Sequence, residues 1–241
     1  MNIAVIFAGG TGQRMNTKSK PKQFLDVYGK PVIVHTLEHF QYHARIDTIV
    51  VVCLEQWIPY CRELVKKFCL MKVEHIVPGG ASAQQSIFNG LKCVYDNYAH
   101  DAVILIHDGV RPLINEQLIS DNIDSVRKSG SAITVSPAIE TIVVKSDDDG
   151  KIGNILERSK CEMAKAPQSF VLEDIYNAHF QAQKEGCKDN FIDSASLMKH
   201  YGYALATVVG PTENIKITTP FDFYLFRAIL DAKENLQIMG M

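Results

Sequence analysis

The chain has 241 residues, enough for one large domain with a substantial core or for two small domains. Hydrophobic residues make up 46% and charged residues 22%, an ordinary balance for a soluble globular protein. The net charge of −2 gives no general attraction to nucleic acid or anionic membranes, so any anion site must be formed locally.

Six cysteines occur without a CxxC pair and at spacings that match neither a zinc site nor a disulfide framework. We expect them to be reduced and mostly buried, as in a cytoplasmic protein. The N-terminal apolar run has the length of a strand and no charged leader, so we expect no signal peptide. Because no apolar run approaches the roughly 20 residues of a membrane helix, we expect no membrane partner. The acidic balance and the lack of a basic stripe disfavour nucleic acid as a partner.

The first half of the chain alternates short apolar runs with amphipathic segments. Runs rich in β-branched residues predict strands covered on both faces, and the segments between them predict helices. The expected strands are 2–8, 48–53, 73–77, 102–106 and 132–135, and the expected helices are 31–43, 55–69, 82–97 and 116–129. This order predicts an α/β fold with a doubly wound, mostly parallel, Rossmann-like sheet and helices on both faces.

The second half begins differently. Residues 140–156 predict a strand, an Asp/Gly turn and a second strand, which together form a β-hairpin. The hairpin is either a plain surface feature or an arm that reaches a neighbouring subunit. Helical patterns return at 172–185, 195–201 and 221–237.

The first expected strand runs into a Gly-rich turn, GGTGQRM at residues 9–15, with PKQ at residues 21–23. Backbone N–H groups of such a turn can point at phosphate oxygens, and glycine lets a ligand approach closely. Met15 stands where a dinucleotide fingerprint needs a small residue, and the Lys-Ser/Thr of a P-loop is absent. A phosphate site is favoured over a simple tight turn by four cations in this loop: Arg14, Lys18, Lys20 and Lys22.

A second polar cluster, HDGVRP at residues 107–112, directly follows the expected strand 102–106. Asp108 is well placed to hold Mg²⁺, which prefers one or two carboxylates together with substrate phosphates. Arg111 can bind a phosphate through two parallel hydrogen bonds. The alternative is an ion pair between Asp108 and Arg111 in a surface turn, and His107 is expected to be a packed or capping residue.

Two further segments complete the set. In residues 214–220, Lys216 and Thr218 alternate with apolar residues and are expected to share one face of a short strand. A lone lysine on a strand is usually solvated, but the two other phosphate-type clusters favour a ligand role here. Gly79-Gly80 precedes the expected helix 82–97, and backbone groups of this turn could contact a base edge.

Six motifs then occur in a recognisable order: AGGTGQRM, PKQF, GKPVIVHTLEHF, HDGVRP, APQSF and NIKITTPFD. Together they resemble the cytidylyltransferases that make CDP-activated polyols, from residue 2 to about residue 230. One branch of that family acts on 2-C-methyl-D-erythritol 4-phosphate in isoprenoid synthesis, and the other on D-ribitol 5-phosphate in teichoic acid and capsule synthesis. The resemblance implies one nucleotidyltransferase domain over residues 1–241 that forms a homodimer through an arm at 139–168.

The resemblance also implies a reaction and roles for matching residues. CMP passes from CTP to a polyol phosphate, pyrophosphate leaves, and Mg²⁺ is held by Asp108. Arg14 and Lys22 stabilise the triphosphate and the leaving pyrophosphate, and Lys216 binds the α-phosphate region. The implied nucleotide-binding residues are Ala8, Gly9, Gly10, Thr11, Gly12, Gly80, Ala81 and Ser86. The implied acceptor-binding residues are Asp108, Arg111, Thr141, Arg158 and Asp193, with Thr141 and Arg158 acting across the dimer interface.

The chain departs from the usual family pattern near the acceptor. The departures are Ala83 for the Arg of GGxxRxxS, Glu140 for Asp, Lys165 and Ala166 for Gln-Thr, and Ile192 for Thr. The forms AGGTGQRM, HDGVRP and APQSF are nearer the ribitol branch, which favours D-ribitol 5-phosphate as the acceptor. The alternatives are the methylerythritol branch and, because Ala83 removes a cation near the nucleotide, a nucleotide-binding protein without activity.

Overall fold

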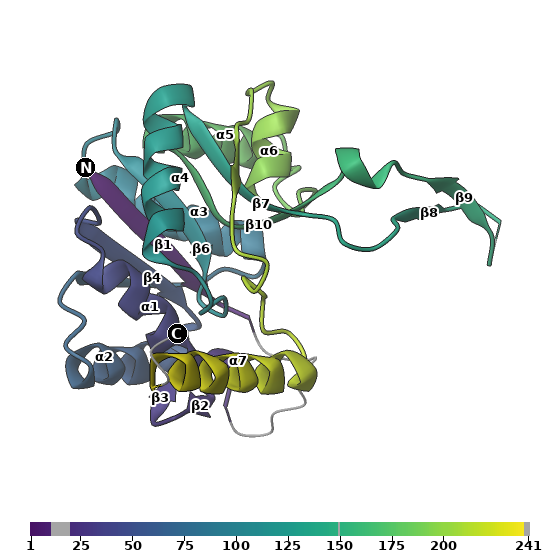
Figure 1. Cartoon of the computed structure of the whole chain (residues 1–241). Helices are drawn as coiled ribbons and strands as arrows, with labels where there is room; N and C mark the ends of the chain where they lie inside the picture. Colours follow the sequence, from purple (N-terminus) through teal and green to yellow (C-terminus); the bar gives the residue numbers. More distant parts are fainter. Residues whose placement is uncertain (11–19, 149, 239–241) are drawn as a thin grey trace.

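A computed structural model describes residues 1–10, 20–148 and 150–238. Its centre is a sheet of seven strands in the order β11-β7-β10-β6-β1-β4-β5 (Figure 1). Only β10 runs antiparallel to its neighbours in this sheet, so the predicted mostly parallel, doubly wound fold is confirmed. The strands are β1 (Asn2–Ala8), β4 (Thr48–Cys53), β5 (Val73–Pro78), β6 (Val103–Asp108), β7 (Ser131–Pro137), β10 (Glu162–Val171) and β11 (Thr207–Val209).

Helices cover both faces of this sheet because its central strands are apolar on both sides. Along β1, Ala4 and Ile6 pack on one face, while Ile3 and Val5 pack on the other. The first face is covered by α1 (Val32–Tyr42), α2 (Ile58–Lys67) and α4 (Glu116–Ser129). The second face is covered by α3 (Ala83–Asn97), α5 (Leu172–Lys184) and α6 (Ser194–His200).

Smaller elements surround the carboxyl edge of the sheet. The last helix, α7 (Pro220–Ile238), packs through Phe226 against Val110 and Ile217. The short elements nearby are the 3-10 turn η2 (Lys22–Phe24), the strand pair β2 (Asp26–Val27) and β3 (Lys30–Pro31), and the 3-10 turn η3 (Glu55–Trp57). Since η3 comes directly before α2, the helix predicted over 55–69 is divided into two elements.

The predicted hairpin is present and projects from the body of the molecule (Figure 1). It pairs β8 (Val143–Lys145) with β9 (Ile152–Ile155), and both strands are exposed along their whole length. The 3-10 turn η4 (Arg158–Lys160) then leads back into β10. We call residues 139–161 the arm.

The cysteines differ in part from the expectation. All six are free, but only Cys53 and Cys61 are buried, so the prediction of mostly buried thiols is wrong. Cys69, for example, is exposed in the turn that follows α2, where no sheet covers it. Within the described part of the chain, no helix is long and apolar enough to span a bilayer.

Helix α3 matters for the site because its first turn borders the carboxyl edge of the sheet. Its position depends on Gly90, where an added Cβ would lie 2.7 Å from methyl groups of both Val5 and Val52. These two valines are fully buried in β1 and β4, so neither can move without disturbing the sheet.

We predict that Gly90→Ala lowers the free energy of unfolding by about 1–3 kcal/mol through overpacking. An alanine at an exposed helical position would instead stabilise the helix, by about 1 kcal/mol relative to glycine. Urea unfolding of this variant measures the effect, with Lys128→Ala on the exposed face of α4 as the control. A Gly90→Ala protein at least as stable as wild type would contradict the close packing of α3.

Candidate active site

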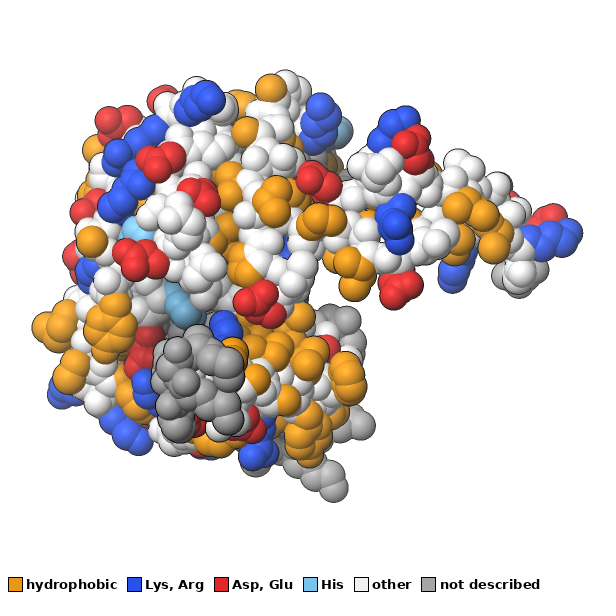
Figure 2. Space-filling view, in the orientation of Figure 1, with side chains coloured by type: hydrophobic (Ala, Val, Ile, Leu, Met, Phe, Trp, Pro, Cys, Tyr) orange, Lys and Arg blue, Asp and Glu red, His pale blue; other side chains and the backbone are white. Residues whose placement is uncertain are grey.

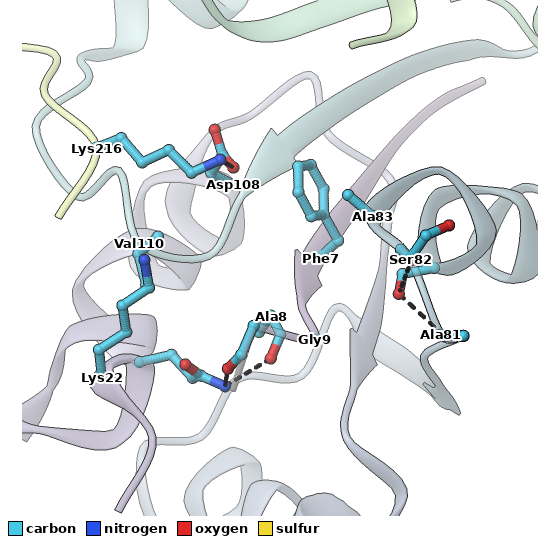
Figure 3. Close-up of a pocket in the computed structure, with 14 residues that line it drawn as sticks. Phe7, Ala8, Gly9, Lys22, Ala81, Ser82, Ala83, Asp108, Val110 and Lys216 are labelled. Carbon is cyan, nitrogen blue, oxygen red and sulfur yellow. Dashed lines mark hydrogen bonds and ion pairs between the residues drawn. The ribbon is translucent and has the colours of Figure 1, made fainter. Parts of the chain in front are cut away.

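A cavity of about 300 Å³ opens at the carboxyl ends of β1 and β6, beside the first turn of α3 (Figure 3). This is the edge at which parallel α/β sheets bind their ligands. Its described lining residues are Phe7, Ala8, Gly9, Gly10, Lys22, Gln23, Gly80, Ala81, Ser82, Ala83, Ser86, Asp108, Val110 and Lys216. We call it the first cavity.

One wall of the first cavity is made of closely packed backbone. The Ser86 hydroxyl accepts a hydrogen bond from the Gly80 N–H at 3.0 Å and donates one to the Ser82 carbonyl at 2.9 Å. A Cβ on Gly9 would lie 3.1 Å from Ser86 Oγ, and a Cβ on Gly80 would lie 2.1 Å from a side-chain carbon of Gln85. The two Gly turns also lie close together, since a Cβ on Gly79 would be 3.8 Å from Gly9 Cα.

Gln23 holds the exit of β1 in place. Its buried side-chain amide donates to the carbonyls of Ala8 at 2.6 Å and Gly10 at 3.2 Å. No role was predicted for Gln23, although it belongs to the PKQ motif next to Lys22. Those two hydrogen bonds identify it as a positioning residue for the start of the Gly-rich turn.

The charged centre of the site is Asp108, the last residue of β6. Its side chain is only 8% exposed, and its two oxygens contact Lys216 Nζ at 2.6 Å and Arg111 Nε at 2.8 Å. Burial would raise the pKa of Asp108, but the Lys216 and Arg111 charges and their hydrogen bonds outweigh it and hold the pKa below its ordinary value. The carboxylate is therefore ionised at neutral pH.

Arg111 also binds the segment that carries Lys216. Its Nη1 donates to the Asn214 carbonyl at 3.0 Å, and the Ile217 N–H donates to the Val110 carbonyl at 2.9 Å. The ion pair between Asp108 and Arg111 thus exists, but it is buried rather than solvated in a surface turn, and Arg111 also links its loop to the distant segment at Asn214.

The prediction of a short strand around Lys216 is wrong. Residues 214–218 form no strand, and the Ile217 N–H bonds to the loop at Val110 instead of to the sheet. Lys216 points at Asp108 (Figure 3), whereas the Thr218 hydroxyl and N–H bind the Asp222 carboxylate in the first turn of α7.

A second cavity of about 220 Å³ adjoins the first. Phe7, Ala83, Asp108 and Lys216 line both cavities. The other described lining residues of the second cavity are Ile87, Ile106, Arg111, Ala164, Lys165, Ala166, Gln168, Ile192, Asp193 and Ser194. The departures from the family pattern at 83, 165, 166 and 192 therefore line one small space, whereas Glu140 is exposed in the arm.

Gln168 and Asp193 hold the floor of the second cavity together. The Gln168 side chain donates to the Asp193 carboxylate at 2.8 Å and accepts from the Ala195 N–H at 2.9 Å. Asp193 also accepts from the Ser196 N–H at 2.8 Å and so caps α6. Much of the hydrogen-bonding capacity of Asp193 is thereby engaged within the protein.

The structure brings most of the predicted site residues to these two cavities. The exceptions within the described residues, which line neither cavity of their own chain, are Thr141 and Arg158 in the arm and Lys20, whose ammonium donates to the Tyr60 hydroxyl at 3.5 Å. Arg158 donates to the Ile139 carbonyl at 3.3 Å and is exposed. Thr11, Gly12, Arg14 and Lys18 lie outside the described residues.

The donor set can be compared with the chemistry of a magnesium site. The described residues contain no cluster of three or more His, Cys, Asp or Glu side chains that could hold a metal ion. Asp108 is the single described carboxylate that lines the first cavity. One carboxylate fits Mg²⁺ when substrate phosphates supply further ligands, and it does not fit a metal held by protein ligands alone.

These features define an α/β protein with a cation-lined cavity at the carboxyl edge of its sheet. Residues 2–232 match the family described as IspD: 2-C-methyl-D-erythritol 4-phosphate cytidylyltransferase. The chain belongs to this family of cytidylyltransferases, which are nucleotidyltransferases.

Relatives match the chain over its full length. It is 52% identical to a ribitol-5-phosphate cytidylyltransferase of Vibrio parahaemolyticus and 54% identical to one of Streptococcus agalactiae serotype V, with 100% of each chain covered. A crystal structure of 4-diphosphocytidyl-2C-methyl-D-erythritol synthase from Anaerococcus prevotii superposes with a TM-score of 0.81 at 26% identity, covering 95% of both chains. Family and fold thus agree with the expectation from the motifs, while the cytoplasmic location and the homodimer stay predictions.

His107 lies directly behind the charged centre and is fully buried. Its Nε2 lies 3.0 Å from the Arg111 carbonyl, to which it donates as the neutral Nε2–H tautomer, and Nδ1 has no partner among the described residues. Burial lowers the pKa of His107 to about 4. His107 is therefore a packed residue that holds the HDGVRP loop, as expected.

We predict a pH-dependent loss of stability from this histidine. The unfolded chain binds a proton below about pH 6.5, whereas the folded protein resists it down to about pH 4, so stability falls as the pH is lowered through that window. The contribution is about 3 kcal/mol, and His107→Gln, which keeps an amide donor for the Arg111 carbonyl, removes it. Urea unfolding between pH 7 and pH 4 would show a shallower decline for the variant, and parallel curves would contradict the assignment.

Proposed function

We propose that this protein transfers CMP from CTP to D-ribitol 5-phosphate, giving CDP-ribitol and pyrophosphate. The observation that carries the proposal is the pair of adjoining cavities that share Asp108 and Lys216. A transferase needs two substrates side by side with cations at the point where they meet, and this arrangement provides both. The full-length relatives named for ribitol 5-phosphate support this acceptor.

In this proposal the first cavity holds CTP. The Gly9 and Gly80 turns offer backbone groups to the cytosine and ribose, while Lys22 and Lys216 neutralise the phosphates. Lys216 lies at the boundary of the two cavities, so its charge acts near the α-phosphate. Arg14, which lies outside the described residues, is assigned to the triphosphate and the leaving pyrophosphate by the resemblance alone.

The acceptor is proposed to bind in the second cavity with its phosphate toward Asp108 and Arg111. A phosphate oxygen of the acceptor attacks the α-phosphorus of CTP, the bond from that phosphorus to the bridging oxygen breaks, and pyrophosphate leaves. A phosphate monoester is already largely ionised near pH 7, so the site needs no strong general base. Catalysis then rests on alignment and charge neutralisation, which the paired cations can supply.

Mg²⁺ fits this scheme through Asp108, whose carboxylate faces both cavities. When bound, the ion would neutralise phosphate charge and orient the reacting groups. Arg111 and Lys216 hold the carboxylate ionised at neutral pH, which is the state that a magnesium ligand requires.

Methylerythritol phosphate is the second candidate acceptor, because the family description and the similar crystal structure carry that name. A nucleotide-binding protein without activity is the least supported reading. The loss of a cation at Ala83 leaves the pairs Asp108–Arg111 and Asp108–Lys216 in place.

We also propose that the protein forms a homodimer through the arm. The arm exposes a row of apolar side chains that the body of its own chain leaves uncovered (Figure 2). These are Ile139, Val143, Val144, Ile152, Ile155 and Leu156. An isolated two-stranded hairpin is at best marginally stable in water, so a partner surface would bury these residues and stabilise the arm.

Purified protein with Mg²⁺ and CTP is expected to release pyrophosphate when D-ribitol 5-phosphate is added. A coupled pyrophosphate assay measures this, with 2-C-methyl-D-erythritol 4-phosphate as the competing acceptor. Turnover with methylerythritol phosphate but not with ribitol phosphate would overturn the assigned acceptor. If neither polyol phosphate is turned over, both candidate acceptors are wrong.

Lys22→Ala is expected to lower kcat/KM by about a hundredfold or more, since it removes a charge that stabilises the transition state. Lys66→Ala, an exposed lysine on α2, is the matched control and should keep wild-type activity. Circular dichroism checks that both variants are folded. Full activity of a folded Lys22→Ala protein would contradict the proposed role of Lys22 at the CTP phosphates.

The arm can be tested by mixing two impaired variants. If Arg158 acts in the partner's site, mixed dimers of Arg158→Ala and Lys22→Ala contain one intact site each, so random exchange restores about a quarter of the wild-type activity. If Arg158 acts in its own chain, no mixture contains an intact site, and activity stays at the level of the separate variants. Light scattering after chromatography reports whether the protein is a dimer.

A further inference from the structure

Lys165 lines the second cavity but has no role in the proposed reaction as described above. It lies where the pairing of β10 with β7 is interrupted between Ala164 and Gln168. Such irregularities turn a side chain away from the regular register of a strand. The result is a partly buried lysine that lines the cavity next to Arg111.

The charges that line the second cavity do not balance. Its described cations are Arg111, Lys165 and Lys216, and its described carboxylates are Asp108 and Asp193. Arg111 and Lys216 share the Asp108 carboxylate, and Asp193 is engaged by Gln168 and by the cap of α6. The described charges of the lining therefore sum to +1, and Lys165 is the one of its three cations that makes no ion pair with a lining carboxylate.

Lys165 has no carboxylate within ion-pair distance among the described residues. Its ammonium group donates to the neutral Thr212 carbonyl at 2.8 Å. The nearest acidic influence is Glu213, whose carboxylate lies 3.9 Å from the ammonium of Lys233. Burial and the nearby Arg111 charge hold the pKa of Lys165 below its ordinary value, as expected for a cation that lacks a counter-ion.

We propose that Lys165 binds the phosphate group of the acceptor and so helps to select a phosphorylated polyol. The inference rests on the proposed function and deepens it, since it concerns the same second cavity. A phosphate group placed between Lys165 and Arg111 would offset the excess positive charge. The ammonium donates three hydrogen bonds, so it can contact the phosphate and still hold Thr212.

A purely structural role is the competing explanation. Through Thr212, Lys165 fastens the segment that leads to Lys216, so its loss could disturb the charged centre instead. Glutamine separates the two roles, because it can still donate to the Thr212 carbonyl but carries no charge. Arginine keeps the charge and is a second matched replacement.

The test is steady-state kinetics with each substrate varied in turn. Lys165→Gln is expected to raise KM for D-ribitol 5-phosphate about tenfold or more, while KM for CTP stays within about twofold of wild type. Lys165→Arg is expected to recover most of the acceptor affinity. The control is Lys199→Gln, which removes one positive charge from the exposed face of the neighbouring helix α6 and should change neither constant.

Calorimetry gives a readout that does not need turnover. D-ribitol 5-phosphate and inorganic phosphate should each bind the Lys165→Gln protein about tenfold more weakly than wild type, while unphosphorylated ribitol should show no difference between the two. An unchanged acceptor KM with unchanged phosphate binding would overturn the proposal. A lower kcat together with similar increases in both KM values would also overturn the proposal, since it would indicate only the structural role.

These outcomes are distinguishable from a failure of the proposed function. If wild type does not turn over ribitol phosphate, the assigned acceptor is wrong. The binding of inorganic phosphate still decides the role of Lys165 in that case. If another polyol phosphate is turned over, the same three variants are compared with that acceptor.

Discussion

The buried carboxylate of Asp108 is the constraint on which the rest of this site depends. An ionised side chain that is only 8% exposed would be costly to keep charged without partners, and Arg111 and Lys216 supply them. Arg111 is three residues away, but Lys216 comes from the far end of the chain. Forming both ion pairs therefore fastens the segment before α7 to the edge of β6.

The ion pair between Asp108 and Lys216 also lies where the two cavities at the carboxyl edge of the sheet meet. Asp108 and Lys216, together with Phe7 and Ala83, line both cavities, and Phe7 lies between Asp108 and Ala83 in Figure 3. Part of the wall of the first cavity is glycine backbone, where an added Cβ would clash at Gly80 and be crowded at Gly9. The second is bounded largely by side chains, which can be exchanged. Changes of acceptor are thus physically easier to accommodate than changes on the side of the Gly turns.

The predictable parts of the fold were those in which local sequence and tertiary environment agree. The strands β1, β4 and β6 contain apolar runs rich in β-branched residues and buried on both faces, so pattern and burial coincide. Strand β10 was missed because its buried centre contains Gln168 and Ser169. The polar groups of these two residues form hydrogen bonds with the start of α6 and with Asn122 of α4, and no local sequence pattern predicts such partners.

The site residues also divide into those that local sequence predicts and those that depend on tertiary contacts. Short sequence motifs indicated the Gly turns and Asp108, because the chemistry of each is contained within a few residues. Lys216 was placed on a strand because its neighbours alternate, yet the ion pair with Asp108 determines its direction. Lys165 was visible only as a departure from a family pattern. Its meaning depends on the charge balance of a cavity assembled from β6, β10, α6 and the segment around Lys216, and that balance exists only in three dimensions.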